Sequence, residues 1–506
     1  MSFISYDFFA FVLILLVLYY LIPYRCRWGV LLLGSMYFYL CSGFGTAVYI
    51  WFTIAVTYVC SLAIERFGTR RTLFFALGVG INVLLLVYTK YAGFIVGTFN
   101  PDGAEILNGS DVIVPLGISF YTLQTIGYLA DVKRGTIAPV KNPLKLALFI
   151  SFFPQLVQGP ISRFGDLSHT LYNVERFEIG NLYYGLQRII WGLFKKLVVA
   201  DRVFVAVNEI TNNIYDYNGG MVFGYMLLYT LELYADFTGG IDIAIGISYC
   251  FGVRLKENFE RPYFSCSISE YWRRWHISMC SWFRDYVFYP LAFSKRMMRV
   301  GKSLGKIVGK RAAKKIPVYL SSFVVWFLTG LWHGAGWNFI VWGMMNFLIL
   351  TISEELSPAY TFFHGKLNKG KKWDKGRGYA AFMMIRTFVI ISALNLFDCF
   401  SDITDTIYAL VTAFDLSRFS NLWSGDMLEL GLTVTDYVIL AVSVVIMFLV
   451  SFLQEKRATK GDVFDIASIH ITPLRYAVTV ILFFSVILLG NYGIGYDSAG
   501  FIYNQF

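Results

Sequence analysis

A histidine inside a long apolar run is the first residue of this sequence that could do chemistry. His333 lies within residues 316–352, a stretch long enough to cross a bilayer, and no charged residue is near it in the sequence. An ionisable side chain at membrane depth is costly, so it usually lines a cavity or faces other helices. An imidazole in such a place is suited to proton transfer.

The neighbours of His333 are small or aromatic. The segment 329–337 contains three glycines, which would let another helix or a substrate approach closely, and three nearby tryptophans could wall a pocket: Gly330, Gly334, Gly336, Trp332, Trp337 and Trp342. The alternative is that His333 is hydrogen-bonded between packed helices and that the glycines serve helix contact only. Local sequence does not decide between the two.

A second histidine lies in a segment of different character, residues 267–286. Ser267 and Glu270 form a capping box, which predicts the start of a helix. Aromatic and apolar residues then recur every three or four positions, on a face that includes His276, and polar residues form the opposite stripe: Trp272, Trp275, Met279, Phe283 and Tyr286 against Arg274, Ser278, Ser281 and Asp285. The pattern predicts one amphipathic helix at the membrane interface.

This helix could be a membrane-surface anchor, which would explain the tryptophans but not His276. One interfacial and one deep histidine would suit proton transfer along a channel. An enzyme and a proton-coupled transporter therefore both remain open at this point.

Acidic residues also occur in an apolar run, residues 221–251, which we expect to be broken at Gly239 and Gly240. Glu232 and Asp236 are one helical turn apart and share a face. They either hydrogen-bond between helices or line a pathway.

Composition fixes the class of protein. Of 506 residues, 57% are hydrophobic and 15% are charged, against roughly 25% charged in soluble domains. We therefore predict an all-α polytopic membrane protein with about eleven transmembrane or re-entrant spans, in a single domain over residues 1–506. The run 143–158, interrupted at Pro154, is short enough to be re-entrant, and 404–414 is too short to cross.

The histidine and cysteine counts argue against a metal centre. Five histidines in the whole chain argue against a multi-histidine site, and the seven cysteines form no C-x-x-C pair.

The net charge of +10 is concentrated in short segments between apolar runs. Residues 295–315 contain nine Lys or Arg and no acid, and residues 366–377 contain six and one Asp. Such loops are typical of the cytoplasmic side, where they face anionic lipid headgroups, so no nucleic-acid partner is expected. The same bias places the N-terminus and residues 100–111 and 491–506 outside.

Several motifs together resemble the membrane-bound O-acyltransferase (MBOAT) superfamily, in the bacterial branch that contains alginate O-acetylase and the D-alanyl transfer protein of teichoic acid synthesis. The specific pair is Trp272-Arg273-Arg274-Trp275-His276 followed, 57 positions after its histidine, by Leu331-Trp332-His333-Gly334. Supporting segments are 115–122, 153–156, 159–163, 236–240, 257–259, 261–263 and 501–506.

The resemblance implies a helical bundle with a central tunnel in the bacterial cytoplasmic membrane. An acyl thioester, either acetyl-CoA or a carrier-protein thioester, would enter from the cytoplasm and meet an acceptor hydroxyl from outside, with no bound cofactor and no metal. It also implies that His333 is the general base and that His276 orients the donor or relays the proton. Supporting residues would be Trp272, Arg274, Asp285, Asp236 and Trp332.

The sequence departs from the alginate-acetylase pattern at residues 289–293 and 344–346, so we do not carry over alginate as the acceptor. The first expectation is O-acetylation of a cell-envelope or exported polysaccharide, with an extracytoplasmic acyltransferase as partner. The alternatives are D-alanyl transfer to teichoic acid from a cytoplasmic acyl carrier protein and a non-catalytic acyl channel or transporter.

Overall fold

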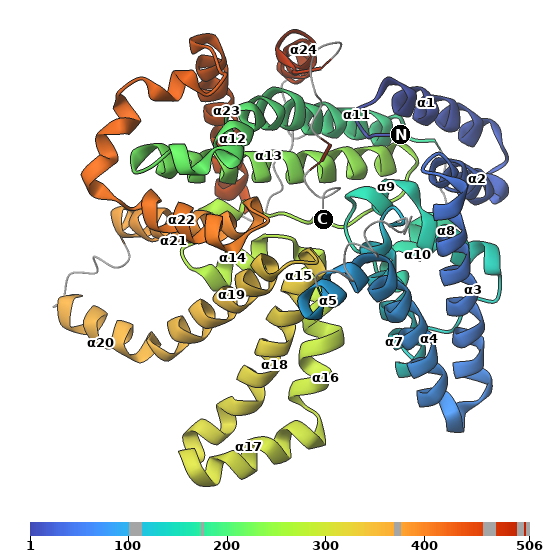
Figure 1. The fold of residues 1–506 in the computed structure, drawn as a ribbon. Helices are drawn as coiled ribbons and strands as arrows, with labels where there is room; N and C mark the ends of the chain where they lie inside the picture. The colour runs from blue at the N-terminus through green and yellow to red at the C-terminus, as the bar shows by residue number, and fades with distance from the viewer. Residues whose placement is uncertain (101–113, 174–176, 369–375, 459–471, 493–499, 502–506) are drawn as a thin grey trace. The chain divides into compact units, whose positions relative to one another are not determined.

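The protein was analysed as a computed structural model that describes residues 1–100, 114–173, 177–368, 376–458, 472–492 and 500–501 (Figure 1). The described residues form helices and no strand, which confirms the all-α prediction. Five helical stretches are long and apolar enough to cross a membrane: Phe44–Arg66, Gly68–Phe99, Ala313–His333, Arg377–Cys399 and Val434–Ala458. Shorter apolar helices accompany them, and the number of spans stays a prediction.

Chain contacts divide the molecule into two compact units, and the single-domain expectation stays a prediction. Unit 1 comprises residues 1–193, 237–257 and 500–505. Its helices are α1 (Tyr6–Leu21), α2 (Arg27–Leu40), α3 (Phe44–Arg66), α4 (Arg71–Leu86), α5 (Ala92–Phe99), α7 (Ile118–Arg134), α8 (Pro143–Ser151), α9 (Phe153–Val157), α10 (Phe164–Tyr172), α11 (Ile179–Leu193) and the end of α13 (Gly220–Cys250).

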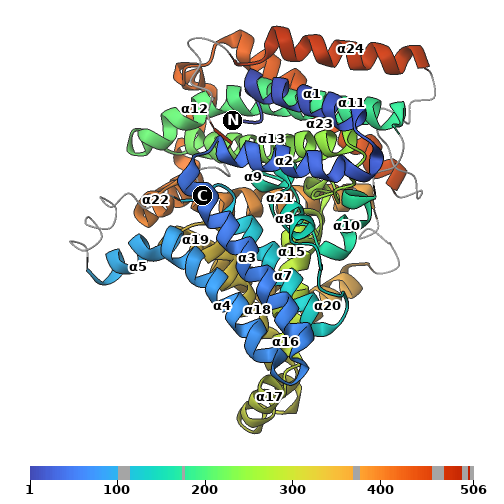
Figure 2. The ribbon, with the colours of Figure 1, turned by 90° about the vertical axis from the view of Figure 1, so that its right-hand side faces the viewer.

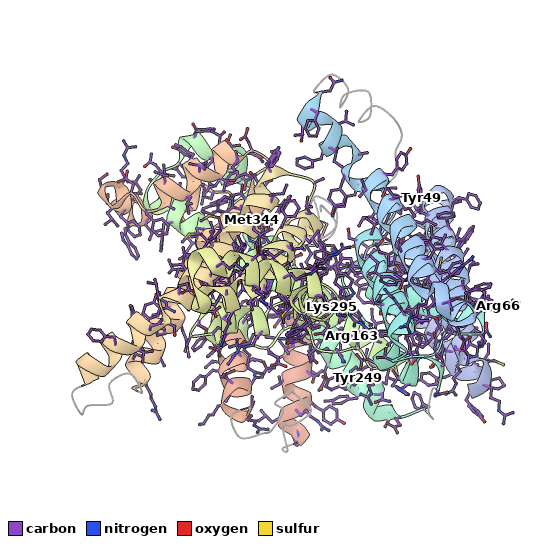
Figure 3. All side chains as sticks on the ribbon, turned by 90° about the horizontal axis from the view of Figure 1, so that it is seen from below. Tyr49, Arg66, Arg163, Tyr249, Lys295 and Met344 are labelled. Carbon is purple, nitrogen blue, oxygen red and sulfur yellow. The ribbon has the colours of Figure 1, made fainter. Side chains whose placement is uncertain are left out.

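Three helices of unit 1, α3, α4 and α7, lie side by side (Figures 1 and 2). Tyr49 and Arg66, labelled in Figure 3, lie towards the two ends of α3. The predicted re-entrant run forms two short helices, α8 and α9, that break at Phe152, two residues before Pro154. Pro154 lies in the first turn of α9, where a proline is tolerated. Residues of α9 are buried throughout, so protein covers the backbone groups that the break frees.

The expected break at Gly239 and Gly240 is wrong, because α13 continues unbroken for 31 residues. A β-carbon at position 240 would lie 1.4 Å from Gln158 Oε1. A side chain at position 240 would therefore displace the Gln158 side chain within unit 1. Each glycine inside a helix costs only about 1 kcal/mol of helix stability, so the pair does not break α13.

Unit 2 comprises residues 194–236 and 258–499 with Phe506. It contains the π-helical segment η4 (Phe194–Ala200), α12 (Asp201–Asn212), the start of α13, α14 (Ile268–Arg274), α15 (Ile277–Phe283), the π-helical segment η7 (Arg284–Phe288), α16 (Tyr289–Ala292), α17 (Lys295–Val308), α18 (Lys310–His333), α19 (Trp337–Glu355), α20 (Ser357–Asn368), α21 (Arg377–Cys399), α22 (Ile403–Ala413), α23 (Val434–Ala458) and α24 (Thr472–Leu489).

The basic segment 295–315 is not a loop, as the sequence suggested, but a helical hairpin of α17 and the start of α18 (Figures 1 and 2). Ser294 caps α17 by accepting a hydrogen bond from the Met297 amide, and Lys295, labelled in Figure 3, is its first residue. Gly305 allows the close contact, since a β-carbon there would lie 2.2 Å from Ala313 Cβ. Lys302 and Lys306 are exposed. Most of the segments 100–111, 366–377 and 491–506 lies outside the described residues.

Candidate functional site

His333 is the last residue of α18, and a short extended link leads directly into α19. Gly334 and Gly336 have extended backbones, and α19 begins at Trp337. The two helices cross closely, because a β-carbon at Gly330 would lie 2.3 Å from the carbonyl oxygen of Phe339. Of the two uses considered for these glycines, the structure shows helix contact at Gly330.

The remaining glycines of the motif differ from Gly330. A β-carbon at Gly334 would lie 2.1 Å from the ring of Phe339, whereas one at Gly336 would have nothing nearer than 3.5 Å. Gly343 on α19 marks a second close approach of α18 and α19, because a β-carbon there would lie 2.4 Å from the carbonyl oxygen of Trp326. Backbone-to-backbone contact thus fixes the end of α18 against α19.

Tryptophans bring the two histidines into one cluster. The His333 ring centroid lies 4.4 Å from that of Trp342, and Trp332 packs edge-on to His276 at 5.7 Å. Both histidines and both tryptophans are buried. Trp337 is 54% exposed, and its place in the wall of a pocket stays a prediction.

Trp272 forms the next layer of the same cluster. Its ring packs against Trp326 at 4.9 Å and Trp342 at 5.6 Å. Its indole Nε1 donates a hydrogen bond to Asn346 Oδ1 at 3.1 Å, and the Asn346 side chain in turn donates to the carbonyl oxygen of Trp342. The indole is therefore held at both its apolar face and its polar edge.

The predicted single amphipathic helix over 267–286 is wrong, because it breaks at His276. The capping box at its start is present: Ser267 Oγ accepts from the Glu270 amide, and Glu270 Oε2 accepts from the Cys266 amide. His276 has a left-handed backbone with φ of 46°, and a new helix, α15, begins after it. The imidazole is therefore fully buried at a break and does not lie on an interfacial stripe.

Asn258 holds this break and was given no role by sequence reasoning. Its side chain lies 3.2 to 3.3 Å from His276 Nδ1, and its Oδ1 accepts hydrogen bonds from the amide and the hydroxyl of Ser278 at 3.0 and 2.8 Å. Its carbonyl oxygen accepts from the Ile277 amide. The only sequence signal was its place in the motif at residues 257–259.

The protonation state of His276 follows from its surroundings. Burial, and secondarily the neighbouring charge of His333, holds the pKa of His276 well below its ordinary value. The imidazole is therefore neutral near pH 7 and can accept a hydrogen bond.

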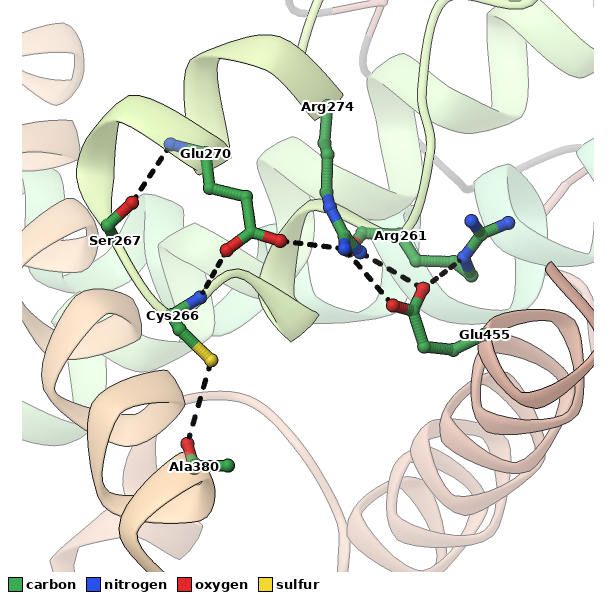
Figure 4. A network of polar contacts seen from close by, with 7 residues as sticks. All are labelled: Arg261, Cys266, Ser267, Glu270, Arg274, Ala380 and Glu455. Carbon is green, nitrogen blue, oxygen red and sulfur yellow. Dashed lines mark hydrogen bonds and ion pairs between the residues drawn. The ribbon is translucent and has the colours of Figure 1, made fainter. Parts of the chain in front are cut away.

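Three other predicted supporting residues lie in ionic clusters. Arg274 pairs with Glu270 and with Glu455 of α23 (Figure 4). Asp285 forms an ion pair with Arg284. Asp236 forms one with the buried Lys196, whose Nζ lies 2.6 Å from Asp236 Oδ1. The contacts of Arg274 and Asp236 join separate elements, whereas Arg284 and Asp285 are neighbours within η7. A direct part in chemistry stays a prediction for each.

Two further observations concern acidic and metal-binding groups. Lys196 also pairs with Asp201 at 2.8 Å, so one buried lysine forms ion pairs with two carboxylates.

Within the part of the chain that the structure describes, no three His, Cys, Asp or Glu side chains gather as a metal site would require.

Comparison with known proteins gives a consistent picture. The model of the membrane-bound O-acyltransferase family, MBOAT, matches residues 137–394. A probable alginate O-acetylase of Azotobacter vinelandii is 32% identical over 86% of this chain and 83% of its own length. A peptidoglycan O-acetyltransferase of Helicobacter pylori is 31% identical over 68% of this chain and 67% of its own, and a teichoic acid D-alanyltransferase of Bacillus subtilis is 31% identical over 51% and 61%.

Proposed function

Because the chain belongs to the membrane-bound O-acyltransferase family, we propose that this multi-pass membrane O-acyltransferase moves an acetyl group from a cytoplasmic thioester towards hydroxyls of a cell-envelope or exported polysaccharide. The observation that carries the proposal is the buried cluster in which Trp332 packs against His276 and adjoins His333. Two imidazoles in one aromatic enclosure suit proton transfer at a site closed to bulk water.

In the proposed mechanism His333 is the general base. Its neutral imidazole takes the proton of the acceptor hydroxyl as the hydroxyl oxygen attacks the thioester carbonyl carbon. The new C–O bond forms, the C–S bond breaks, and the thiolate leaves and recovers the proton from the imidazolium. His276, neutral and held by Asn258, orients the donor or relays this proton.

The aromatic residues around the histidines exclude water from the proposed site. Trp272, Trp332 and Trp342 are each less than 10% exposed. Excluding water protects the thioester from hydrolysis and strengthens the electrostatic interactions of the imidazoles. No bound cofactor takes part in the proposal, since the donor is itself a substrate.

Acetyl transfer is preferred to D-alanyl transfer because the acetyl-transferring relatives match a larger share of this chain. The acetyl-transferring relatives match 68% to 86% of it, whereas the D-alanyltransferase of Bacillus subtilis matches 51%. D-alanyl transfer from a carrier protein is the second candidate, supported by that same 31% identity. The non-catalytic channel considered from sequence is set aside, because the family and these relatives are transferases.

The donor can be tested directly. Membrane vesicles from cells that produce the protein are supplied with acetyl-CoA labelled in its acetyl group or with a D-alanyl carrier-protein thioester labelled in its alanine. We expect alkali-labile label in the polysaccharide fraction from acetyl-CoA, and none above the level of vesicles lacking the protein from the D-alanyl thioester. Label from the D-alanyl thioester alone would replace this proposal with the second candidate.

The proposed partners follow from the two sides of the membrane. The acyl group is handed to an extracytoplasmic acyltransferase, and lipid surrounds the helices, with anionic headgroups near the basic hairpin of α17 and α18. An acyl carrier protein on the cytoplasmic side belongs to the second candidate.

Orientation is a separate expectation that rests on the Lys and Arg bias. We expect residues 295–315 and 366–377 to be cytoplasmic and the N-terminus outside. In a cysteine-free background, a membrane-impermeant thiol reagent should label Asn100→Cys in sealed cells and should label Lys306→Cys only after permeabilisation. Strong labelling of Lys306→Cys in sealed cells would reverse the orientation.

A further inference from the structure

Two strained residues mark the segment that carries His276. Among the described residues, Arg261 (φ 50°) and His276 (φ 46°) are the non-glycine residues with a positive φ. A side chain in this left-handed region costs about 1–2 kcal/mol, and such strain persists only where the surroundings hold it in place.

Both residues belong to one small backbone pairing in unit 2. The Glu260 amide donates to the Arg274 carbonyl oxygen at 2.9 Å, and the Ile277 amide donates to the Asn258 carbonyl oxygen at 3.0 Å. Residues 258–261 thus lie alongside residues 274–277. Whatever fixes the ends of this pairing also fixes the backbone of His276.

A single carboxylate holds one end of the pairing. Glu455, near the end of α23, accepts from Arg261 Nε at 2.6 Å and from Arg274 Nη1 and Nη2 at 3.0 and 3.1 Å (Figure 4). The three side chains are 19% to 24% exposed, so solvent screens these ion pairs only in part. Glu455 therefore joins the two segments of the pairing, residues 258–261 and 274–277, through their arginines.

Charge balance makes the arrangement depend on Glu455. Arg274 also pairs with Glu270 at 2.7 Å, so the group contains two cations and two anions. Without the Glu455 charge, the two guanidinium groups would keep one carboxylate, that of Glu270, which pairs with Arg274 and not with Arg261. Mutual repulsion would then push residues 261 and 274 apart.

We propose that Glu455 is a positioning residue for His276. Its ion pairs hold residues 258–261 against residues 274–277, and this pairing keeps the His276 backbone left-handed and its ring against Trp332. The inference rests on the proposed role of His276 in acyl transfer. Glu455 itself acts through the pairing and not on the reacting atoms.

The test is a double-mutant cycle on acyl transfer. Glu455→Gln keeps the size of the side chain and removes its charge. We expect it to lower kcat by about 10-fold in the parent protein, because small misplacements of a catalytic group are costly, and by less than 2-fold in the His276→Ala background. Glu455→Asp should recover part of the loss. Equal losses in both backgrounds would overturn the inference.

A matched control makes the same chemical change elsewhere in unit 2. Glu355 on α19 pairs with Lys315 at 2.5 Å in a more exposed place, and Glu355→Gln should leave kcat unchanged. A loss of kcat in Glu355→Gln equal to that in Glu455→Gln would overturn the inference.

Amide hydrogen exchange separates this inference from the proposed function. In Glu455→Gln, peptides covering residues 258–278 should lose protection, because the pairing amides open more often. Unchanged protection, or lost protection with full activity, would overturn the positioning role. Full activity of His276→Ala would instead contradict the proposed function of His276.

Discussion

Replacement of His333 by alanine is expected to lower acyl transfer by roughly two to four orders of magnitude, the usual contribution of a positioned general base. The protein should remain folded, because the helix crossing depends on Gly330 and Gly343 and not on the imidazole. The measurement is ester formation on the envelope acceptor, with protein amount and monodispersity in detergent determined in parallel.

His333→Gln is the sharper variant for the same position. Glutamine keeps polarity and approximate size but has no nitrogen that titrates near neutral pH. A general base cannot be replaced in this way, so transfer should fall as far as in the alanine variant. Full activity in well-folded His333→Gln protein would refute the assignment.

Replacement of Gly330 by leucine is expected to destabilise the protein by about 3 kcal/mol or more and to reduce the yield of folded protein. A β-carbon there would lie 2.3 Å from the Phe339 carbonyl oxygen, which is backbone of α19 and cannot rotate away. The whole end of α18, with His333, would have to move. The measurements are the melting temperature in detergent and the monodisperse fraction after extraction.

Gly336 provides the control within the same motif. Its added β-carbon would meet nothing nearer than 3.5 Å, and its backbone is extended, so Gly336→Ala should melt within a few degrees of the parent. If Gly330→Leu and Gly336→Ala both melted at the temperature of the parent protein, close helix contact would not be the reason for a glycine at position 330.

Long apolar helices could be predicted well from the sequence because their length and composition are imposed by the bilayer. The apolar runs 46–64, 380–397 and 434–453 of the sequence correspond to α3, α21 and α23, and each helix end lies at most five residues from the end of its run. Ends depend on capping and on polar contacts that hydropathy does not report.

Backbone breaks could not be predicted in the same way. The aromatic period of residues 272–286 continues through the left-handed His276 without a sign of the break. The turn to α15 depends on hydrogen bonds that Asn258 accepts from Ser278, and these leave no periodic pattern in the sequence. Conversely, Gly239 and Gly240 suggest a break in the sequence but lie inside α13, where the Gln158 side chain packs against Gly240.

The residues of the candidate site could be predicted from the sequence, but the distant residues that hold them in place could not. His276, His333, Trp272 and Trp332 follow from motifs, and the structure places them in one cluster. Contacts across long sequence separations carry no local pattern, and Glu455 lies 181 residues from Arg274.

The end of α18 at His333 has an electrostatic consequence. The peptide dipoles of a helix sum to about half a negative charge at its C-terminal end, and cations are favoured there. The proposed general base becomes a cation when it accepts the hydroxyl proton. The backbone of α18 thus supplies a field of the sign that favours this imidazolium, in a motif whose sequence contains no carboxylate. If His333 is the general base, the end of this span would stabilise the imidazolium as a buried aspartate does in Ser-His-Asp acyl-transfer enzymes.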